Sequence, residues 1–197
     1  SPFGYQGLDE TQRTGIRVDI SHVSDSTYYQ TIRYVNVPVI ASHSSCRKFT
    51  PGFERNMSDD MITKIKGNGG VIMVNFGSTF LDSNIEKYND SMRTELRNLL
   101  VDKGLDEKSE EGKKFNEAFQ KSHPKLYSDV QKVADHIDHI VALAGIDHVG
   151  FGSDYDGVGD SLPTGLKDVS DFPNLIYELL TRGYSDSDIE KMCSGNV

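Results

Sequence analysis

The sequence has few cysteines and no long hydrophobic run. Cys46 and Cys193 are the two cysteines in 197 residues, which is too few for a disulfide scaffold and says little about compartment. No apolar run approaches membrane-spanning length, and no signal-peptide pattern opens the chain. These absences argue against a small disulfide-stabilised protein and against a membrane-spanning bundle.

Excess positive charge is also missing. Lys and Arg total 21 against 30 Asp and Glu, so the net charge is −9, and no basic cluster stands out. This balance argues against nucleic-acid binding. Nucleophile-elbow, P-loop and dinucleotide-binding motifs are absent as well. With 26% charged and 36% hydrophobic residues, the composition indicates a globular chain that is long enough for one domain with a core.

Two short apolar runs near the N-terminus are each followed by Ser-His. Residues 16–20 and 37–41 have the character of strands, and residues 25–35 between them have helical periodicity. A strand–helix–strand unit makes its two strands parallel. We therefore expect His22 and His43 at the same, C-terminal edge of one sheet, where α/β folds place their chemistry.

His22 and His43 in this arrangement are candidate metal ligands, because neutral imidazole is the commonest protein ligand for metals and suits zinc. The alternative is that each is a strand-end histidine hydrogen-bonded to a neighbouring loop. A single histidine would favour that alternative, whereas two in matched positions leave both explanations open.

The rest of the chain continues to alternate strands and helices. The pattern predicts strands at 71–76 and 148–152, and helices at 8–14, 58–67, 128–145, 170–182 and 185–193. Without hairpin signals, this order implies an α/β fold of four parallel βα units, the C-terminal half of a (β/α)8 TIM barrel. Residues 83–119 are polar and weakly periodic, so we expect one or two exposed helices inserted there.

Two further residues are suited to a metal-dependent reaction. Asp154 follows the last predicted strand, at the same edge as His22, and a carboxylate there can bind metal or move a proton. Its surroundings do not form a calcium loop, because Val158 and Gly165 stand where oxygen ligands belong. Arg55 can clamp a substrate carboxylate bidentately, although a surface salt bridge is the simpler explanation for an isolated arginine.

His136 and His139 lie three residues apart on one predicted helix, so they are placed to chelate a metal. The apolar stripe beside them already gives this helix a packing role. We therefore expect packing there rather than a site.

Four segments together, DISHVS, VIASHSS, ERNMSDD and GFGSDYDG, resemble the membrane (renal) dipeptidase family of zinc peptidases. The phrases VADHIDHIVALAG and GLKDVSDFPNLIYELLTRGYS are similar to that family too. The likeness covers nearly the whole chain except 83–119. It implies a (β/α)8 barrel with two zinc ions at its C-terminal face.

The resemblance also implies roles for individual residues. His22 and His43 would bind one zinc ion, Arg55 would hold the substrate, and Asp154 would transfer a proton. The chain departs from the family where Phe80 falls near a tyrosine that lines the substrate pocket. The family's His-x-Asp pair, its bridging Glu and another pocket histidine would lie upstream of Ser1.

The chain begins abruptly at Ser1 without Met, and it stops just after the predicted helix at 185–193. We interpret residues 1–197 as part of a longer barrel domain, with the insertion at about 83–119. Half a barrel has unpaired strand edges and an incomplete set of metal ligands. We therefore expect these residues alone to be inactive and marginally stable.

For the whole protein, the resemblance implies zinc-dependent hydrolysis of dipeptides. The alternatives are a related metal-dependent amidohydrolase acting on another amide or lactam, and a degenerate barrel that binds a partner without catalysis. The implied partner is a dipeptide. Homodimers are common in the family, and membrane attachment would require a lipid anchor outside these residues. An animal-type member would lie at the cell surface or outside the cell, and a microbial one in the cytoplasm.

Overall fold

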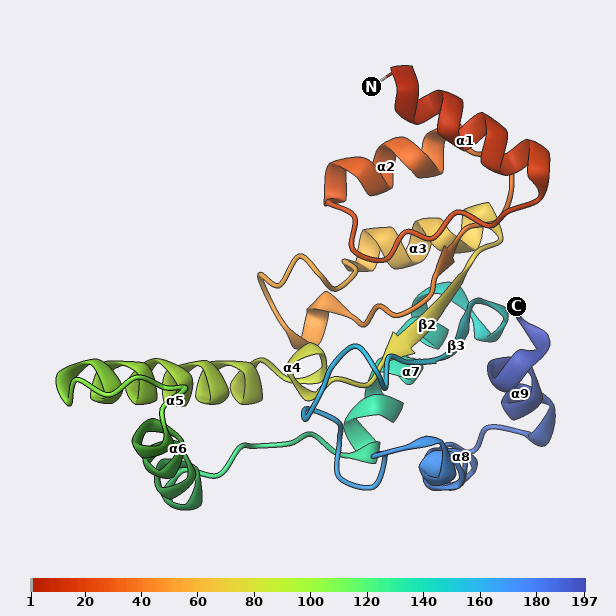
Figure 1. The fold of residues 1–197 in the computed structure, drawn as a ribbon. Coiled ribbons are helices and arrows are strands. Elements are labelled where there is room, and N and C mark those ends of the chain that lie inside the picture. The colour runs from red at the N-terminus through yellow and green to blue at the C-terminus, as the bar shows by residue number, and fades with distance from the viewer. Residues whose placement is uncertain (1) are drawn as a thin grey trace.

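Three short parallel strands form the central sheet, and their spatial order follows their order in the chain (Figure 1). The strands are β1 (Ile40–Ala41), β2 (Val71–Asn75) and β3 (Val149–Ser153). The computed structural model describes residues 2–197. Ile40 pairs with Val71, and Ile72 pairs with Val149. The sheet is therefore parallel throughout, as the alternation of strands and helices predicts.

Helices connect and flank the strands. The α-helices are α1 (Pro2–Thr14), α2 (Asp25–Tyr34), α3 (Asp59–Asn68), α4 (Ser78–Leu81), α5 (Ser83–Asp102), α6 (Glu110–Ser122), α7 (Val130–Ala144), α8 (Phe172–Thr181) and α9 (Asp186–Glu190). Single turns of other helix types are η1 (Arg47–Phe49), η2 (Ile146–His148), η3 (Val169–Asp171) and η4 (Lys191–Gly195). Within residues 2–197, no helix is both long and apolar enough to cross a membrane.

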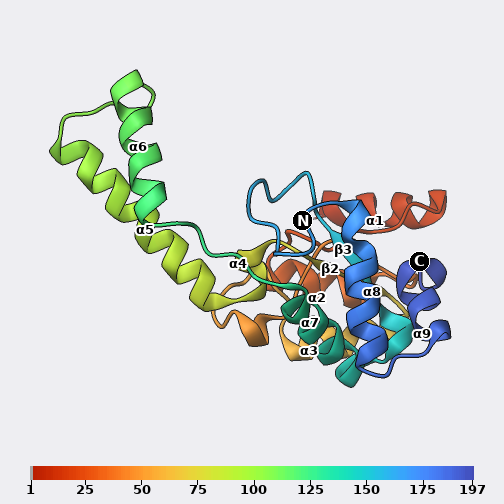
Figure 2. The ribbon, with the colours of Figure 1, turned by 90° about the horizontal axis from the view of Figure 1, so that it is seen from below.

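The helices α2, α3, α7, α8 and α9 pack against one another in that order around the outside of the sheet. In Figure 1, α1, α2 and α3 lie on the side of the sheet where β1 is, whereas α8 and α9 lie on the opposite side, past β3. The hairpin of α5 and α6 projects away from this body in both views (Figures 1 and 2). The one or two exposed helices expected over 83–119 are thus two helices, and the second ends at Ser122 rather than 119.

Capping residues explain where several helices begin and end. The Ser24 side chain accepts a hydrogen bond from the backbone N–H of Thr27, and Ser58 does the same for Met61. Such caps satisfy amide donors that have no partner within the helix. Helix α3 ends at Gly69, whose φ of 76° suits glycine.

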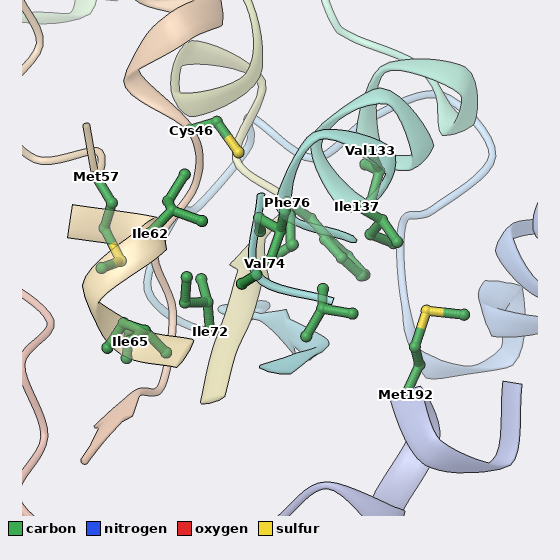
Figure 3. Packing of buried hydrophobic residues seen from close by; sticks show 14 of the residues in the cluster. Cys46, Met57, Ile62, Ile65, Ile72, Val74, Phe76, Val133, Ile137 and Met192 are labelled. Carbon is green, nitrogen blue, oxygen red and sulfur yellow. The ribbon is translucent and has the colours of Figure 1, made fainter. Parts of the chain in front are cut away.

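The hydrophobic core lies between the sheet and helices α3 and α7. Ile72 and Val74 of β2 are fully buried, together with Ile62 of α3 and Ile137 of α7. Figure 3 shows the β2 side chains between those of the two helices. Burying a side chain of this size stabilises the fold by roughly 1.5–3 kcal/mol. Met73, which alternates to the other face of β2, is only half-buried.

The prediction of a strand at 16–20 is wrong. Asp19 forms one isolated parallel bridge with Ile40, supported by hydrogen bonds from Ile20 N–H to the Ile40 carbonyl (2.8 Å) and from Ile40 N–H to the Val18 carbonyl (3.0 Å). The physical reason is the shortness of β1, which offers this segment too few partners for a ladder. Ile16, the first residue of the predicted strand, is 63% exposed.

Strand β1 is shorter than the predicted 37–41 because other groups take its hydrogen bonds. Pro38 has no N–H to donate, and the Val39 N–H donates to the Asn68 side chain at 2.8 Å. Helix α1 begins at Pro2 rather than residue 8, with proline at a first helical position that tolerates it. In place of the four parallel βα units expected, the structure has three paired strands and one bridged segment.

His136 is a buried structural histidine that connects α7 to two other elements. The Cys46 backbone N–H donates to its Nδ1 at 2.9 Å, so Nε2 carries the proton and donates to the Leu81 carbonyl at 3.1 Å. Burial lowers the pKa of His136 to about 4, and the hydrogen bond to Leu81 opposes that shift. The native state therefore holds this imidazole in its neutral form.

We expect the intact protein to lose stability as the pH falls from about 6.5 to 4. Over this window the unfolded chain takes up a proton at His136 that the folded chain does not, so the free energy of unfolding decreases, by roughly 3 kcal/mol in total. Denaturant unfolding at a series of pH values measures this slope. His136→Gln should be less stable at pH 7 but flatter in this window.

His123→Gln is the matched control, because His123 lies at the end of α6, outside the core. The control should retain the wild-type slope. Equal slopes in His136→Gln and in wild type would contradict the role given to His136.

Candidate functional site

Three predicted site residues meet at the C-terminal edge of the sheet. His22 follows the bridged segment, His43 follows β1, and Asp154 follows β3. The His22 and His43 ring centroids are 4.9 Å apart, with the planes tilted by 59°. The parallel pairing thus places these side chains together although they are separated by up to 132 positions in the chain (22 to 154).

Backbone strain is concentrated at this edge. Among residues 2–197, His22 (φ 63°), Ser153 (φ 44°) and Asp154 (φ 64°) are the non-glycine residues with positive φ. Such conformations cost on the order of 1–3 kcal/mol each and persist where the surrounding structure fixes them. Two of the three carry candidate site side chains.

The His22 imidazole is electrostatically coupled to the other site residues. Desolvation lowers its pKa, and the Arg55 guanidinium and the neighbouring His43 lower it further, whereas the carboxylates of Asp154 and Asp19 oppose the shift. The net direction is downward. His22 is therefore neutral at neutral pH, which is the form that can bind a metal.

The His43 imidazole is oriented through Ser42 and Asp19. The Ser42 hydroxyl donates to Asp19 Oδ2 at 2.5 Å and lies 2.7 Å from His43 Nδ1. Because a hydroxyl has one proton, Ser42 Oγ must accept from His43 Nδ1–H. The Nε2 lone pair of His43 is then left available for a ligand.

Asp19 is ionised, which lets it accept the Ser42 hydrogen bond that orients His43. Burial would raise its pKa, but hydrogen bonds from Ser42 and Ser21 outweigh burial, and the net pKa is lowered. The Ser21 N–H donates to Asp19 Oδ1 at 2.9 Å, and the Ser21 hydroxyl accepts from the His43 N–H at 3.1 Å. Ser21, Ser42 and His43 therefore belong to one hydrogen-bonded network around Asp19.

Arg55 reaches the same edge from the loop before α3. Its guanidinium donates to the Ser44 hydroxyl at 3.2 Å and to the His43 carbonyl at 3.1 Å, and it lies 5.5 Å from the centroid of the Phe80 ring. Within residues 2–197 it has no carboxylate at ion-pair distance, and its buried Nε has no hydrogen-bond partner. The surface salt bridge considered for Arg55 is therefore wrong.

The loop that carries Arg55 is fixed from both sides. Arg47 pairs bidentately with Asp25 at 2.7 and 2.8 Å and donates to the Asn56 carbonyl at 2.8 Å. The buried Asn56 side chain donates to Thr50 Oγ1 and to the Phe80 carbonyl, each at 2.7 Å. Arg55 is thus presented on a rigid loop.

The Asp154 carboxylate has one oxygen anchored. The side-chain amide of Asn75, which is fully buried at the end of β2, donates to Asp154 Oδ2 at 2.8 Å. Sequence reasoning missed Asn75, Asp19 and Ser42. A signal for Asn75 was present, because it is the polar residue within the apolar run VIMVNF.

The described residues fit part of a metal site rather than a complete one. His22 and His43 present two neighbouring imidazoles, whereas no group of three or more His, Cys, Asp or Glu suited to a metal occurs within residues 2–197. His136 and His139 do not form a chelate: both ring nitrogens of His136 bond to backbone groups, and His139 Nε2 lies 2.8 Å from Asp59 Oδ1. This agrees with the packing role expected for their helix.

Known proteins with a similar sequence are dipeptidases. The chain is 37% identical over 194 residues to Dipeptidase verJ of Clonostachys rogersoniana, covering 98% of this chain and 39% of that protein. It is 31% identical over 195 residues to Dipeptidase 3 of Mus musculus, covering 99% of this chain and 31% of that protein. The chain therefore spans less than two fifths of the length of either relative.

A solved structure with a similar fold is a metallo peptidase from Rhodobacter sphaeroides, liganded with a phosphinate mimic of the dipeptide L-Ala-D-Ala. The TM-score is 0.73 at 25% identity, over 98% of this chain and 44% of that one. The family model described as membrane dipeptidase (peptidase family M19) matches residues 1–197. The chain therefore belongs to the membrane dipeptidase family.

Proposed function

We propose that this chain supplies one part of the active site of a zinc-dependent dipeptidase. The observation that carries the proposal is the convergence of four side chains at one sheet edge: His22, His43, Arg55 and Asp154. They supply two neighbouring imidazoles, an arginine with no ion-pair partner within residues 2–197, and an anchored carboxylate. Family membership and the dipeptidases among its relatives support the reaction class.

We infer that residues 1–197 belong to a (β/α)8 barrel, of which they form about half, with α5 and α6 as an insertion. Parallel strands in chain order and helices packed in chain order around their outer face support this inference. Residues outside this chain would complete the barrel and supply the remaining ligands of two zinc ions.

In this proposal His22 and His43 hold zinc through neutral imidazoles. When bound, zinc would polarise the scissile carbonyl and lower the pKa of water. Arg55 binds the free carboxylate of the dipeptide with the two terminal nitrogens of its guanidinium. Asp154 accepts a proton from the attacking water and gives it to the leaving amine.

The experiment that tests this function measures bound zinc and dipeptide hydrolysis in the intact protein. We expect zinc-dependent hydrolysis that is lost on chelation, and His43→Ala should lower both zinc occupancy and kcat/KM, the latter by at least about 100-fold. His123→Ala on the α6 side is the control. Wild-type protein that neither binds zinc nor cleaves dipeptides would favour the degenerate barrel, and cleavage of other amides alone would favour the related amidohydrolase.

Arg55→Met should weaken recognition of the substrate carboxylate specifically. We expect kcat/KM for a dipeptide to fall about 10- to 100-fold, since a charge-assisted hydrogen-bonded pair is lost. The same dipeptide with a C-terminal amide should be affected far less. Arg97→Met, on the exposed face of α5, is the control, and equal losses on both substrates would rule out the carboxylate clamp.

Ser42→Ala should weaken zinc binding without removing a ligand. The variant lets the His43 ring rotate and change its tautomer, so we expect the zinc dissociation constant to rise about 10-fold. Titration against a competing chelator measures it, with Ser91→Ala on exposed α5 as the control. Unchanged zinc affinity would show that the chain from Asp19 to His43 does not orient the ligand.

A further inference from the structure

Asn75 occupies a position where a buried polar side chain requires an explanation. It is 0% exposed at the C-terminal end of β2, where the register against β3 shifts between Val74 and Asn75 so that Asn75 pairs with Ser153. Its carbonyl accepts a hydrogen bond from the Ser45 hydroxyl at 3.0 Å. The shift turns the end of β2 toward the residue that precedes Asp154.

The orientation of the Asn75 amide follows from its partners. Its Oδ1 lies 2.7 Å from the Gly77 backbone N–H, which can only donate. Oδ1 must therefore be the acceptor on that side, and Nδ2 must face Asp154 Oδ2, to which it donates at 2.8 Å. A flipped amide would lose both hydrogen bonds, so the donor toward Asp154 is fixed.

The second carboxylate oxygen of Asp154, Oδ1, packs against Gly157. A Cβ at Gly157 would lie 2.1 Å from Asp154 Oδ1, so no other residue fits there without moving the carboxylate. The Asp154 carbonyl accepts from the N–H groups of Gly157 (3.0 Å) and Val158 (3.2 Å), which closes the turn. The carboxylate is thus held on one oxygen by a donor, while the other has no side-chain hydrogen bond within residues 2–197.

We propose that Asn75 is a positioning residue for the proton transfer by Asp154. This inference rests on the proposed function. The Asn75 amide donates to Oδ2 of Asp154, so Oδ1 is the oxygen that accepts the proton during the reaction. Oδ1 takes a proton from water as the new C–O bond forms, and returns it to nitrogen as the C–N bond breaks. Asp154 ends ionised, and one water has been added across the peptide bond.

Asn75→Asp in the intact zinc-bound protein tests the proposal. It keeps the shape and the acceptor for Gly77, but replaces the amide donor with a buried carboxyl group that competes with Asp154 for a proton. We expect kcat for a dipeptide to fall about 10- to 100-fold with little change in KM. For the matched ester, which has the same free carboxylate, the loss should be several-fold smaller, because an alkoxide leaves with less need of a proton than an amine. Asn98→Asp, on exposed α5, controls for the added charge.

A second variant and a double mutant distinguish a role of Asn75 in orienting Asp154 from a general loss of structure or of zinc. If Asn75→Asp loses its zinc or its cooperative unfolding, Asn75→Ser is measured with the same two substrates. In an Asp154→Asn background the substitution at Asn75 should cost nothing further. Equal losses on amide and ester, or an additive double mutant, would overturn the role of Asn75 while leaving the dipeptidase function intact. Wild-type protein without hydrolysis would overturn the proposed function and this inference with it.

Discussion

Parallel pairing of β1, β2 and β3 is the constraint on which the site depends. Each strand ends at the same edge, so the residues that follow them meet there whatever their separation in the chain. The core enforces this pairing, because Ile72 and Val74 of β2 are buried between α3 and α7 and a one-residue slip would turn them to the opposite face. Packing on one face of the sheet thereby fixes the positions of polar groups at its edge.

Sequence reasoning predicted the parts of this arrangement that depend on local pattern. The helices that follow Ser24 and Ser58, the parallel alternation, and the shared edge of His22 and His43 all follow from residue types and spacing. The failure at 16–20 has a tertiary cause. A ladder needs several consecutive partners on the neighbouring strand, and β1 is cut short by Pro38 and by the side chain of Asn68.

The hydrogen-bond networks could not have been predicted in the same way. Asp19 lies 24 positions before His43, and Asn75 lies 79 before Asp154, so no local pattern relates them. Both connect one strand to the next across the sheet edge. A buried asparagine in an apolar strand does indicate that some partner exists, because an unpaired buried amide is costly, but the partner itself is set by the register of β2 against β3.

The two arginines of one loop show how the fold separates support from function. Arg47 is satisfied by Asp25 and by backbone carbonyls, and it holds the loop in place. Arg55, eight residues later, is half-buried, with desolvation lowering its pKa, while Asp154 and Asp19 oppose that shift without pairing with it. A partly desolvated cation without a carboxylate partner destabilises the free protein. A ligand carboxylate would relieve that cost. Because Arg47 already holds the loop rigid, little conformational entropy is lost when Arg55 binds the ligand, so the rigidity favours binding rather than the stability of the unliganded fold.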